Sequence, residues 1–285
     1  MRFSSSIGRL PALACLLALA LFAQPPAAAP GDRPADPPEE FSADRPGFGE
    51  SAGTVAPGVL QLEGGFLAEA HALAGGTLRN ISVPQPLLRI GLTRRLEMRL
   101  EADGFQRQSE ASGDPGGRHS GYSDMSVGAK ARVLREGPLR PAVALLVSVS
   151  LPVGSSYFSS QGIDPEFHFC WSKSLPRGLD LSGNFNFAWR TGGPQWTSER
   201  AASFQAGHGL AAGLHGYAEI YRVGPIEGDE PAHVVASGGV YRVLGANAQV
   251  DFEAGHTLAA RTPSWFAGFG FAVRRPLPAF FRHRR

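Results

Sequence analysis

The side chains that could do chemistry in this 285-residue chain recur at every second position and form no compact motif. Glu97, Arg99, Glu101 and Asp103, for example, alternate with apolar neighbours. In an extended chain, alternate side chains share one face, so such a run puts charges of both signs on a common surface. Charged surfaces of this kind can select ions when they line a pore. They can equally form cross-strand ion pairs, each contributing roughly 0.2 to 1 kcal/mol.

Two interpretations of these charged residues stay open. They could line a polar pore, or they could fill the interior of a closed barrel, as side chains do in eight-stranded barrels. The candidates are Arg89, Glu97, Arg99, Glu101, Asp103, Lys130, Arg132, Asp251 and Glu253. Further polar residues with the same parity are Gln61, Glu63, Glu69, His168, Asp180, Asn184, Asn186, Arg190, Glu219 and Gln249.

The sequence offers little for catalysis. His233 and Ser237 share a strand face but are four residues apart, roughly 13 Å along an extended strand. A nucleophile needs its base within hydrogen-bond reach. No Cys/His cluster has the spacing of metal ligands. We therefore expect no enzyme, no catalytic residue, no metal and no cofactor, and a lipid hydrolase is the weakest alternative.

The elements that must position the charges are strands with an apolar second face. Between residues 179 and 190, Leu179, Leu181, Phe185, Phe187 and Trp189 alternate with polar residues. A soluble sandwich also alternates, but its polar face normally meets bulk water. A transmembrane barrel alternates in the opposite sense, with lipid outside and water inside. The pattern predicts an all-β, closed antiparallel transmembrane β-barrel of about twelve strands, preceded by a signal peptide.

Strand candidates and their connections agree with such a barrel, because bacterial barrels have short periplasmic turns and longer outer loops. The expected strands are 58–70, 80–92, 95–106, 123–134, 141–152, 165–174, 178–190, 200–210, 213–223, 232–243, 246–256 and 264–274. The expected inner turns are 93–94, 135–140, 175–177, 211–212 and 244–245. The expected outer loops are 71–79, 107–122, 153–164, 191–199, 224–231 and 257–263.

The ends of the chain indicate export. Residues 1–29 read as a secretory signal peptide cleaved between residues 23 and 29, because a short basic start precedes an apolar run that is too short for a permanent span. We expect a periplasmic lead-in at 30–57, an outer-membrane barrel at 58–274 and a basic tail at 275–285. The net charge of +2 gives no reason to expect nucleic-acid binding. Cys170 is the only cysteine after cleavage, which excludes an intramolecular disulfide.

A resemblance adds to this interpretation. The run Ala43-Asp44-Arg45-Pro46-Gly47-Phe48-Gly49-Glu50-Ser51, followed by Gln61-Leu62-Glu63-Gly64-Gly65-Phe66, resembles the opening of the putative MetA-pathway of phenol degradation family. Further matches are Leu88-Arg89-Ile90-Gly91-Leu92, Gly121-Tyr122-Ser123-Asp124 and Ser150-Leu151-Pro152-Val153-Gly154. The resemblance implies an outer-membrane barrel and the passage of small molecules such as aromatic compounds.

Asp44, Arg45 and Glu50 in this opening are candidates for a constriction. The segment could fold into the lumen, where Arg45 and Glu50 would bind wall charges, or it could cap the first strand from the periplasm.

Together with the family resemblance, the sequence predicts a passive channel for small, aromatic or hydrophobic molecules in the outer membrane of a Gram-negative bacterium. Its expected partners are the lipid bilayer with lipopolysaccharide, the outer-membrane assembly machinery and a small-molecule solute, and we expect a monomer. The alternative is a plugged, structural or surface-exposed barrel without transport.

Overall fold

The computed structural model describes residues 41–73, 75–110, 117–191, 197–211, 213–225, 232–260 and 262–277. The expected signal peptide and its cleavage region lie outside these residues, as does the expected basic tail beyond residue 277. In the described part of the chain, no helix is both long enough and apolar enough to cross a membrane.

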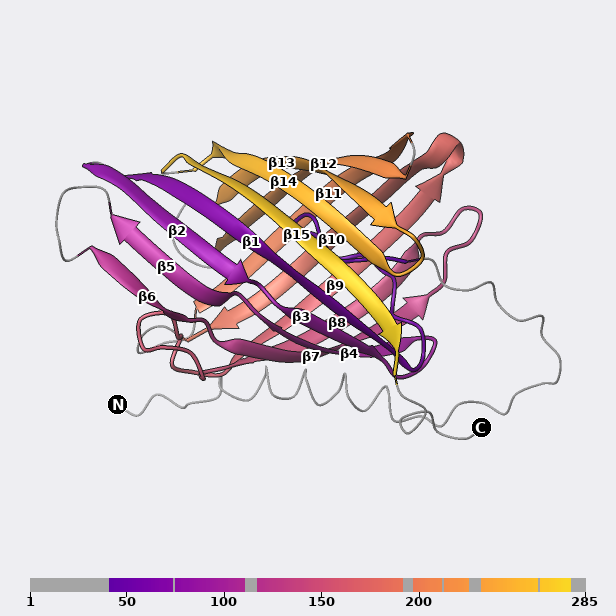
Figure 1. Cartoon of the computed structure of the whole chain (residues 1–285), viewed down its shortest axis with the longest axis horizontal. Coiled ribbons are helices and arrows are strands. Elements are labelled where there is room, and N and C mark those ends of the chain that lie inside the picture. The colour runs from indigo at the N-terminus through magenta and orange to yellow at the C-terminus, as the bar shows by residue number, and fades with distance from the viewer. Residues whose placement is uncertain are drawn as a thin grey trace, which may run out of the picture. The chain divides into compact units, whose positions relative to one another are not determined.

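The described strands form one antiparallel sheet that closes into a barrel, because β1 pairs with β15 (Figure 1). The strands are β1 (Val59–Leu73), β2 (Gly76–Pro84), β3 (Leu87–Gly91), β4 (Leu96–Ala102), β5 (Gly104–Glu110), β6 (Arg118–Tyr122), β7 (Met125–Leu134), β8 (Ala142–Leu151), β9 (Asp164–Leu175), β10 (Leu179–Arg190), β11 (Thr197–Ala211), β12 (Leu214–Pro225), β13 (His233–Leu244), β14 (Ala248–Ala259) and β15 (Ser264–Pro276). A 3-10 turn at Pro176–Gly178 links β9 to β10.

The fifteen strands make twelve passages through the barrel wall, which confirms the predicted fold class and strand number. Three passages are interrupted, and each consists of two strands in line: β2 with β3, β4 with β5, and β6 with β7. β1 shows this directly, since it pairs with β2 at one end and with β3 at the other.

Local chemistry explains two of the interruptions. Pro84 ends β2 and Pro86 lies in the gap before β3, and proline has no N–H to give to the ladder. Gly104 begins β5 with a φ of 79°, a conformation that favours glycine. A Cβ on Gly104 would lie 2.6 Å from the carbonyl oxygen of Val83. The alternation of apolar and polar residues in the sequence gives no sign that these strands are interrupted.

The two faces of the wall have the polarity expected of a membrane barrel. Phe185 and Phe252 are 51% and 50% exposed on the outer face, whereas the adjacent Asn184 and Asp251 are 1% and 7% exposed toward the lumen. Charged residues such as Arg89 and Lys130 are among the most buried large side chains. Apolar surface therefore faces outward and the interior is polar.

Two of the expected loops, 71–79 and 107–122, are wrong over most of their described residues. These residues are strand, since β1 continues to Leu73, β2 begins at Gly76, β5 reaches Glu110 and β6 begins at Arg118. β2 pairs with β1 on one side and with β5 on the other, so its backbone groups are satisfied in spite of its polar side chains. The strands therefore extend into stretches whose polar composition had indicated loops. We call the barrel end that holds Val59 and Pro276 the turn end, and the opposite end the loop end.

Replacement of a residue on the outer face tests this orientation of the wall. Phe185→Arg should destabilise the barrel in bilayers by about 2 to 4 kcal/mol, because arginine there meets hydrocarbon. The adjacent Asn186→Arg places the same side chain in the lumen and should cost clearly less. Unfolding in liposomes, followed by circular dichroism, measures both changes. Equal costs would contradict the assigned faces.

Candidate functional site

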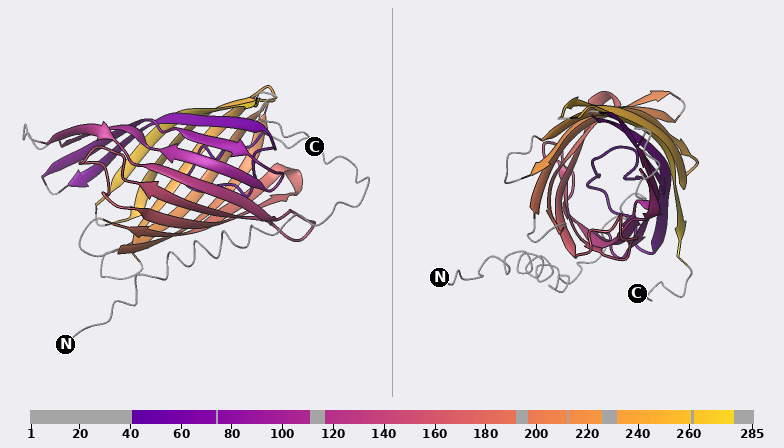
Figure 2. Two further views of the ribbon diagram at one scale, coloured as in Figure 1. Left: turned by 90° about the horizontal axis from the view of Figure 1, so that it is seen from below. Right: turned by 90° about the vertical axis from the view of Figure 1, so that its left-hand side faces the viewer.

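Residues 41–57, which we call the inner segment, lie inside the ring of strands (Figure 2, right). These residues belong to the expected lead-in at 30–57, and of the two positions considered for its Asp44-Arg45-Pro46 opening, in the lumen or as a cap on the first strand, the described residues take the first. The inner segment has no helix or strand, so its backbone N–H groups need partners elsewhere. Wall side chains accept them: Asp44 and Arg45 donate to Glu63, Gly47 to Glu253, Phe48 and Gly49 to Glu219, Glu50 to Asn184, and Val55 to Glu97, at 2.7 to 3.2 Å.

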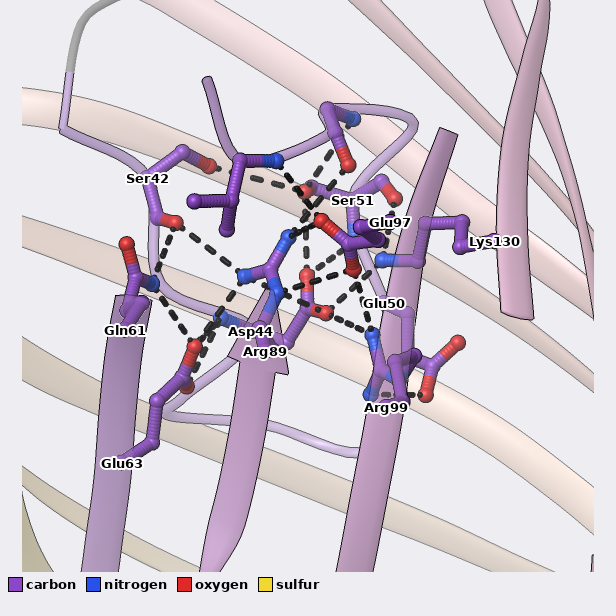
Figure 3. A network of polar contacts seen from close by, with 12 residues as sticks. Ser42, Asp44, Glu50, Ser51, Gln61, Glu63, Arg89, Glu97, Arg99 and Lys130 are labelled. Atoms are coloured by element: carbon purple, nitrogen blue, oxygen red, sulfur yellow. Dashed lines mark hydrogen bonds and ion pairs between the residues drawn. The ribbon is translucent and has the colours of Figure 1, made fainter. Parts of the chain in front are cut away.

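Asp44 is the centre of a buried charge cluster between the inner segment and the wall (Figure 3). Its Oδ2 lies 2.5 Å from Arg99 Nη1, 2.7 Å from Lys130 Nζ and 3.4 Å from Arg89 Nη1. Its Oδ1 accepts hydrogen bonds from the backbone N–H and the hydroxyl of Ser51. Burial alone would raise the pKa of Asp44, but the three cations hold it well below its usual range.

Arg89 connects this cluster to two wall carboxylates. Its Nε lies 2.9 Å from Glu97 Oε1 and its Nη1 lies 3.0 Å from Glu63 Oε1. Nη1 also donates to the backbone carbonyl of Ser42 in the inner segment, at 3.2 Å. Three cations thus face three carboxylates on β1, β3, β4, β7 and the inner segment. A buried ionic network of this kind is tolerable only when every member is paired, and removal of one partner typically costs about 3 to 5 kcal/mol.

Glu50 extends the network along the wall from β4 to β9. One carboxylate oxygen lies 2.9 Å from Arg99 Nη2 on β4, and the other lies 3.4 Å from His168 Nδ1 on β9. Burial tends to raise the pKa of Glu50, but Arg99 and His168 lower it from 4.5 to about 2. His168 also contacts Glu166, which in turn pairs with Arg190. Since Phe48 is also bonded to Glu219 on β12 and Val55 to Glu97 on β4, the inner segment contacts walls on both sides of the barrel.

The contacts of Arg45 are looser. Its Nη2 lies 3.5 Å from Asp251 Oδ1 and 3.6 Å from Glu253 Oε1, and Nη1 donates to Gln85 Oε1 at 3.2 Å. Among the described residues, Nε and Nη2 of Arg45 have no hydrogen-bond partner, and neither have the carboxylate oxygens of Asp251. The backbone of Arg45 is hydrogen-bonded to Glu63 and Gln249, but its guanidinium is held mainly by longer-range attraction, in contrast to the tightly bonded carboxylate of Asp44.

A cavity of about 710 Å³ lies in the lumen between the inner segment and the loop end. Phe48 and Glu50 of the inner segment contribute to its floor, and the ring of Phe48 stacks on Tyr221 with centroids 4.3 Å apart. Carboxylates outnumber arginines nine to three in its lining. They are Asp44, Glu50, Glu69, Glu101, Asp103, Asp124, Asp164, Glu166 and Glu253, against Arg45, Arg99 and Arg190.

Seven of the nine predicted pore residues fall into two groups in the structure. Arg89, Glu97 and Lys130 are at most 1% exposed and bind the inner segment. The cavity lining includes Arg99, Glu101, Asp103 and Glu253. The remaining two belong to neither: Asp251 lies beside Arg45, and Arg132 donates to the carbonyl of Arg94 at the turn end. The predicted constriction residues Asp44, Arg45 and Glu50 all lie in the lumen and contact wall charges.

Several residues that take part in the site had no role predicted from the sequence. Glu63, Asn184, Glu219 and His168 share the inward parity, which marked them as lumen residues but did not single them out as partners of the inner segment. The stacking of Phe48 on Tyr221 had no sequence signal. In the part of the chain that the structure describes, no group of His, Cys, Asp and Glu is arranged to hold a metal ion.

A family model described as "Putative MetA-pathway of phenol degradation" matches residues 43–274. The chain belongs to this family. The match begins in the inner segment and includes almost the whole barrel, so the segment and the wall form part of one family pattern. The resemblance of the Asp44-Arg45-Pro46 opening to the phenol degradation family is thereby confirmed.

Solved structures share the fold. An outer membrane channel from Pseudomonas putida F1 is 15% identical with a TM-score of 0.61, over 79% of this chain and 98% of that one. The translocator domain of the autotransporter NalP from Neisseria meningitidis is 13% identical with a TM-score of 0.52, over 76% of this chain and 88% of that one. These identities establish likeness of fold alone. No curated protein was found to match the chain.

The lowered pKa of Glu50 predicts a pH dependence of stability. A carboxyl whose pKa falls on folding stabilises the folded state above its unfolded pKa, and this contribution disappears as the pH falls through the folded pKa. The stability lost in Glu50→Gln should therefore be constant above about pH 5 and should shrink between pH 4.5 and about 2.

Chemical denaturation at a series of pH values measures this difference. Glu110→Gln, at an exposed position at the loop-end tip of β5, is the matched control and should show little difference from the native protein. A difference between native protein and Glu50→Gln that does not shrink in acid would contradict the assigned ion pairs of Glu50.

Proposed function

We propose that this member of the phenol degradation family is a passive outer-membrane channel for small molecules, in which the inner segment forms the constriction. The observation that carries the proposal is the cavity of about 710 Å³, whose floor is the inner segment and whose sides are the barrel wall. A lumen that contains such a volume differs from one filled by wall side chains. The tight side of the constriction is the Asp44 cluster, and the loose side is Arg45.

The proposed orientation puts the turn end in the periplasm and the loop end outside a Gram-negative cell. The outward apolar face supports contact with the lipid bilayer, as in outer-membrane barrels. We further propose that the chain is a monomer inserted by the outer-membrane assembly machinery. Diffusion of the solute through the lumen requires no energy source.

The lining of the cavity supports a class of solute. Apolar and aromatic groups lie among its polar ones, namely Phe48, Leu67, Phe158, Tyr221 and Phe266. Such side chains suit aromatic or modestly hydrophobic molecules. The family description, which refers to phenol degradation, agrees with this class. The excess of carboxylates favours neutral and cationic solutes over anions.

One observation favours the rival, a plugged barrel. The inner segment contacts walls on both sides of the lumen and is anchored by buried charges. The lipid hydrolase alternative gains no support, since Ser237 donates its hydroxyl hydrogen bond to Glu219 rather than to a histidine.

Single-channel recording in planar bilayers tests the constriction. Arg45→Ala removes a long side chain from the loose side of the inner segment and should raise the conductance. Arg95→Ala, at an exposed position at the turn end, is the matched control and should leave it unchanged. Unchanged conductance in Arg45→Ala would refute the constriction. Native protein without conductance or solute uptake into liposomes would establish the plugged barrel.

The acidic lining predicts a preference for cations. Glu69, Glu101 and Asp103 line the cavity, and Arg99, at 3.5 Å from Glu101, contacts three other carboxylates as well. The triple replacement Glu69→Gln, Glu101→Gln and Asp103→Asn should therefore reduce the potassium-over-chloride preference. Reversal potentials in a salt gradient measure it, with Glu136→Gln at the turn end as the control. A triple variant with native selectivity would place the selective charges elsewhere.

A further inference from the structure

Three arginines form a patch at the loop end on β2, β5 and β6. Arg79 pairs with Ser109 on β5, and Ser109 pairs in turn with Arg118 on β6. Arg107 lies two residues from Ser109 along β5, on the same face of the sheet. Because neighbouring strands are about 4.8 Å apart, Arg79 and Arg118 have their backbones only about 10 Å apart. We call these three residues the arginine patch.

The arginine patch faces away from the lumen. The positions between its members turn inward, since Asn80 donates to Glu69 in the lumen and Gln108 accepts a hydrogen bond from Tyr157. The ring of His119 stacks on that same tyrosine with centroids 3.7 Å apart. Alternation then directs the neighbouring Arg79, Arg107 and Arg118 outward, and all three are exposed.

Below the arginine patch the same outer face is apolar. Ile81 pairs directly with Arg107, and Val83 pairs with Phe105, which is in edge contact with Tyr122. All four apolar side chains are at least 37% exposed. The sheet thus changes from hydrocarbon-compatible to strongly basic within two residues, about 7 Å along the strand.

The positive charge of the arginine patch is not compensated within the described protein. None of the three guanidinium groups forms an ion pair with a described residue. The outward neighbours in the ladder are Ala70, Ser109 and Ser120, which carry no charge. Three cations this close repel one another unless an anion lies among them. Arginine binds phosphate particularly well, because its planar fork of donors matches two phosphate oxygens.

We propose that the arginine patch and the apolar face below it bind lipopolysaccharide of the outer leaflet through its lipid A part. The guanidinium groups donate to the lipid phosphates, and the acyl chains lie along Ile81, Val83 and Phe105. The inference goes beyond channel activity and rests only on the proposed orientation of the loop end toward the outer leaflet. Arg200 on β11 and Arg222 on β12 are also exposed and face outward at the loop end, on another part of the barrel wall.

Binding of purified bisphosphorylated lipid A to the full-length protein in detergent tests the proposal, with native mass spectrometry as the readout. Each basic side chain near an anionic lipid surface contributes about five-fold, so Arg79→Gln, Arg107→Gln and Arg118→Gln together should weaken binding roughly 100-fold. The matched control replaces Arg95, Arg177 and Arg275 at the turn end with glutamine, makes the same change in net charge and should bind as the native protein does. Circular dichroism confirms that both variants are folded.

Two further measurements separate the possible sources of the effect. Monophosphorylated lipid A should bind the native protein more weakly, and millimolar inorganic phosphate should not displace the bisphosphorylated lipid. Native binding by the arginine patch variant, equal loss in the control variant, or a change in oligomeric state in place of lipid binding would each overturn the proposal. Because the patch lies outside the lumen, its variant should keep native conductance, so a failure of this proposal is distinguishable from a failure of the channel proposal.

Discussion

The pairing of buried charge between Asp44 and the barrel wall is the interaction on which the rest of the structure depends. Arg89, Arg99 and Lys130 project into a lumen where an unpaired charge is costly, and Asp44 lies within 3.4 Å of all three. The inner segment in turn has no secondary structure of its own and relies on wall carboxylates for its backbone donors. Wall and segment therefore complete each other, and each would be left with unsatisfied groups alone.

This pairing also gives the lumen its asymmetry. Asp44 ties one side of the inner segment to β3, β4 and β7 with short side-chain contacts, whereas the guanidinium of Arg45 lies 3.5 Å or more from the carboxylates of β14. A channel needs an obstacle that stays in place and yet leaves space beside it. A tightly paired carboxylate at Asp44 and a loosely held guanidinium at Arg45, beside an acidic cavity, are consistent with that requirement.

Much of the fold could be predicted from the twofold alternation, because a barrel wall imposes that period on every strand. Phe185 outside and Asn184 inside follow from parity alone, as do the twelve wall passages. The interruption at Gly104 and the strand extension through Arg79 could not be predicted, since they depend on backbone geometry and on neighbouring strands. Parity likewise placed Arg89 and Glu101 in the lumen, but only the path of the inner segment decides that the first is an anchor and the second lines the cavity.

Amide hydrogen exchange of the inner segment tests the central claim most directly. If wall carboxylates hold the backbone donors of Phe48, Gly49 and Val55, these amides should exchange slowly in the native protein, although they belong to no helix or strand. In Asp44→Asn the same amides should exchange much faster while those of the wall strands stay protected. Rapid exchange at these three amides in the native protein would contradict the account.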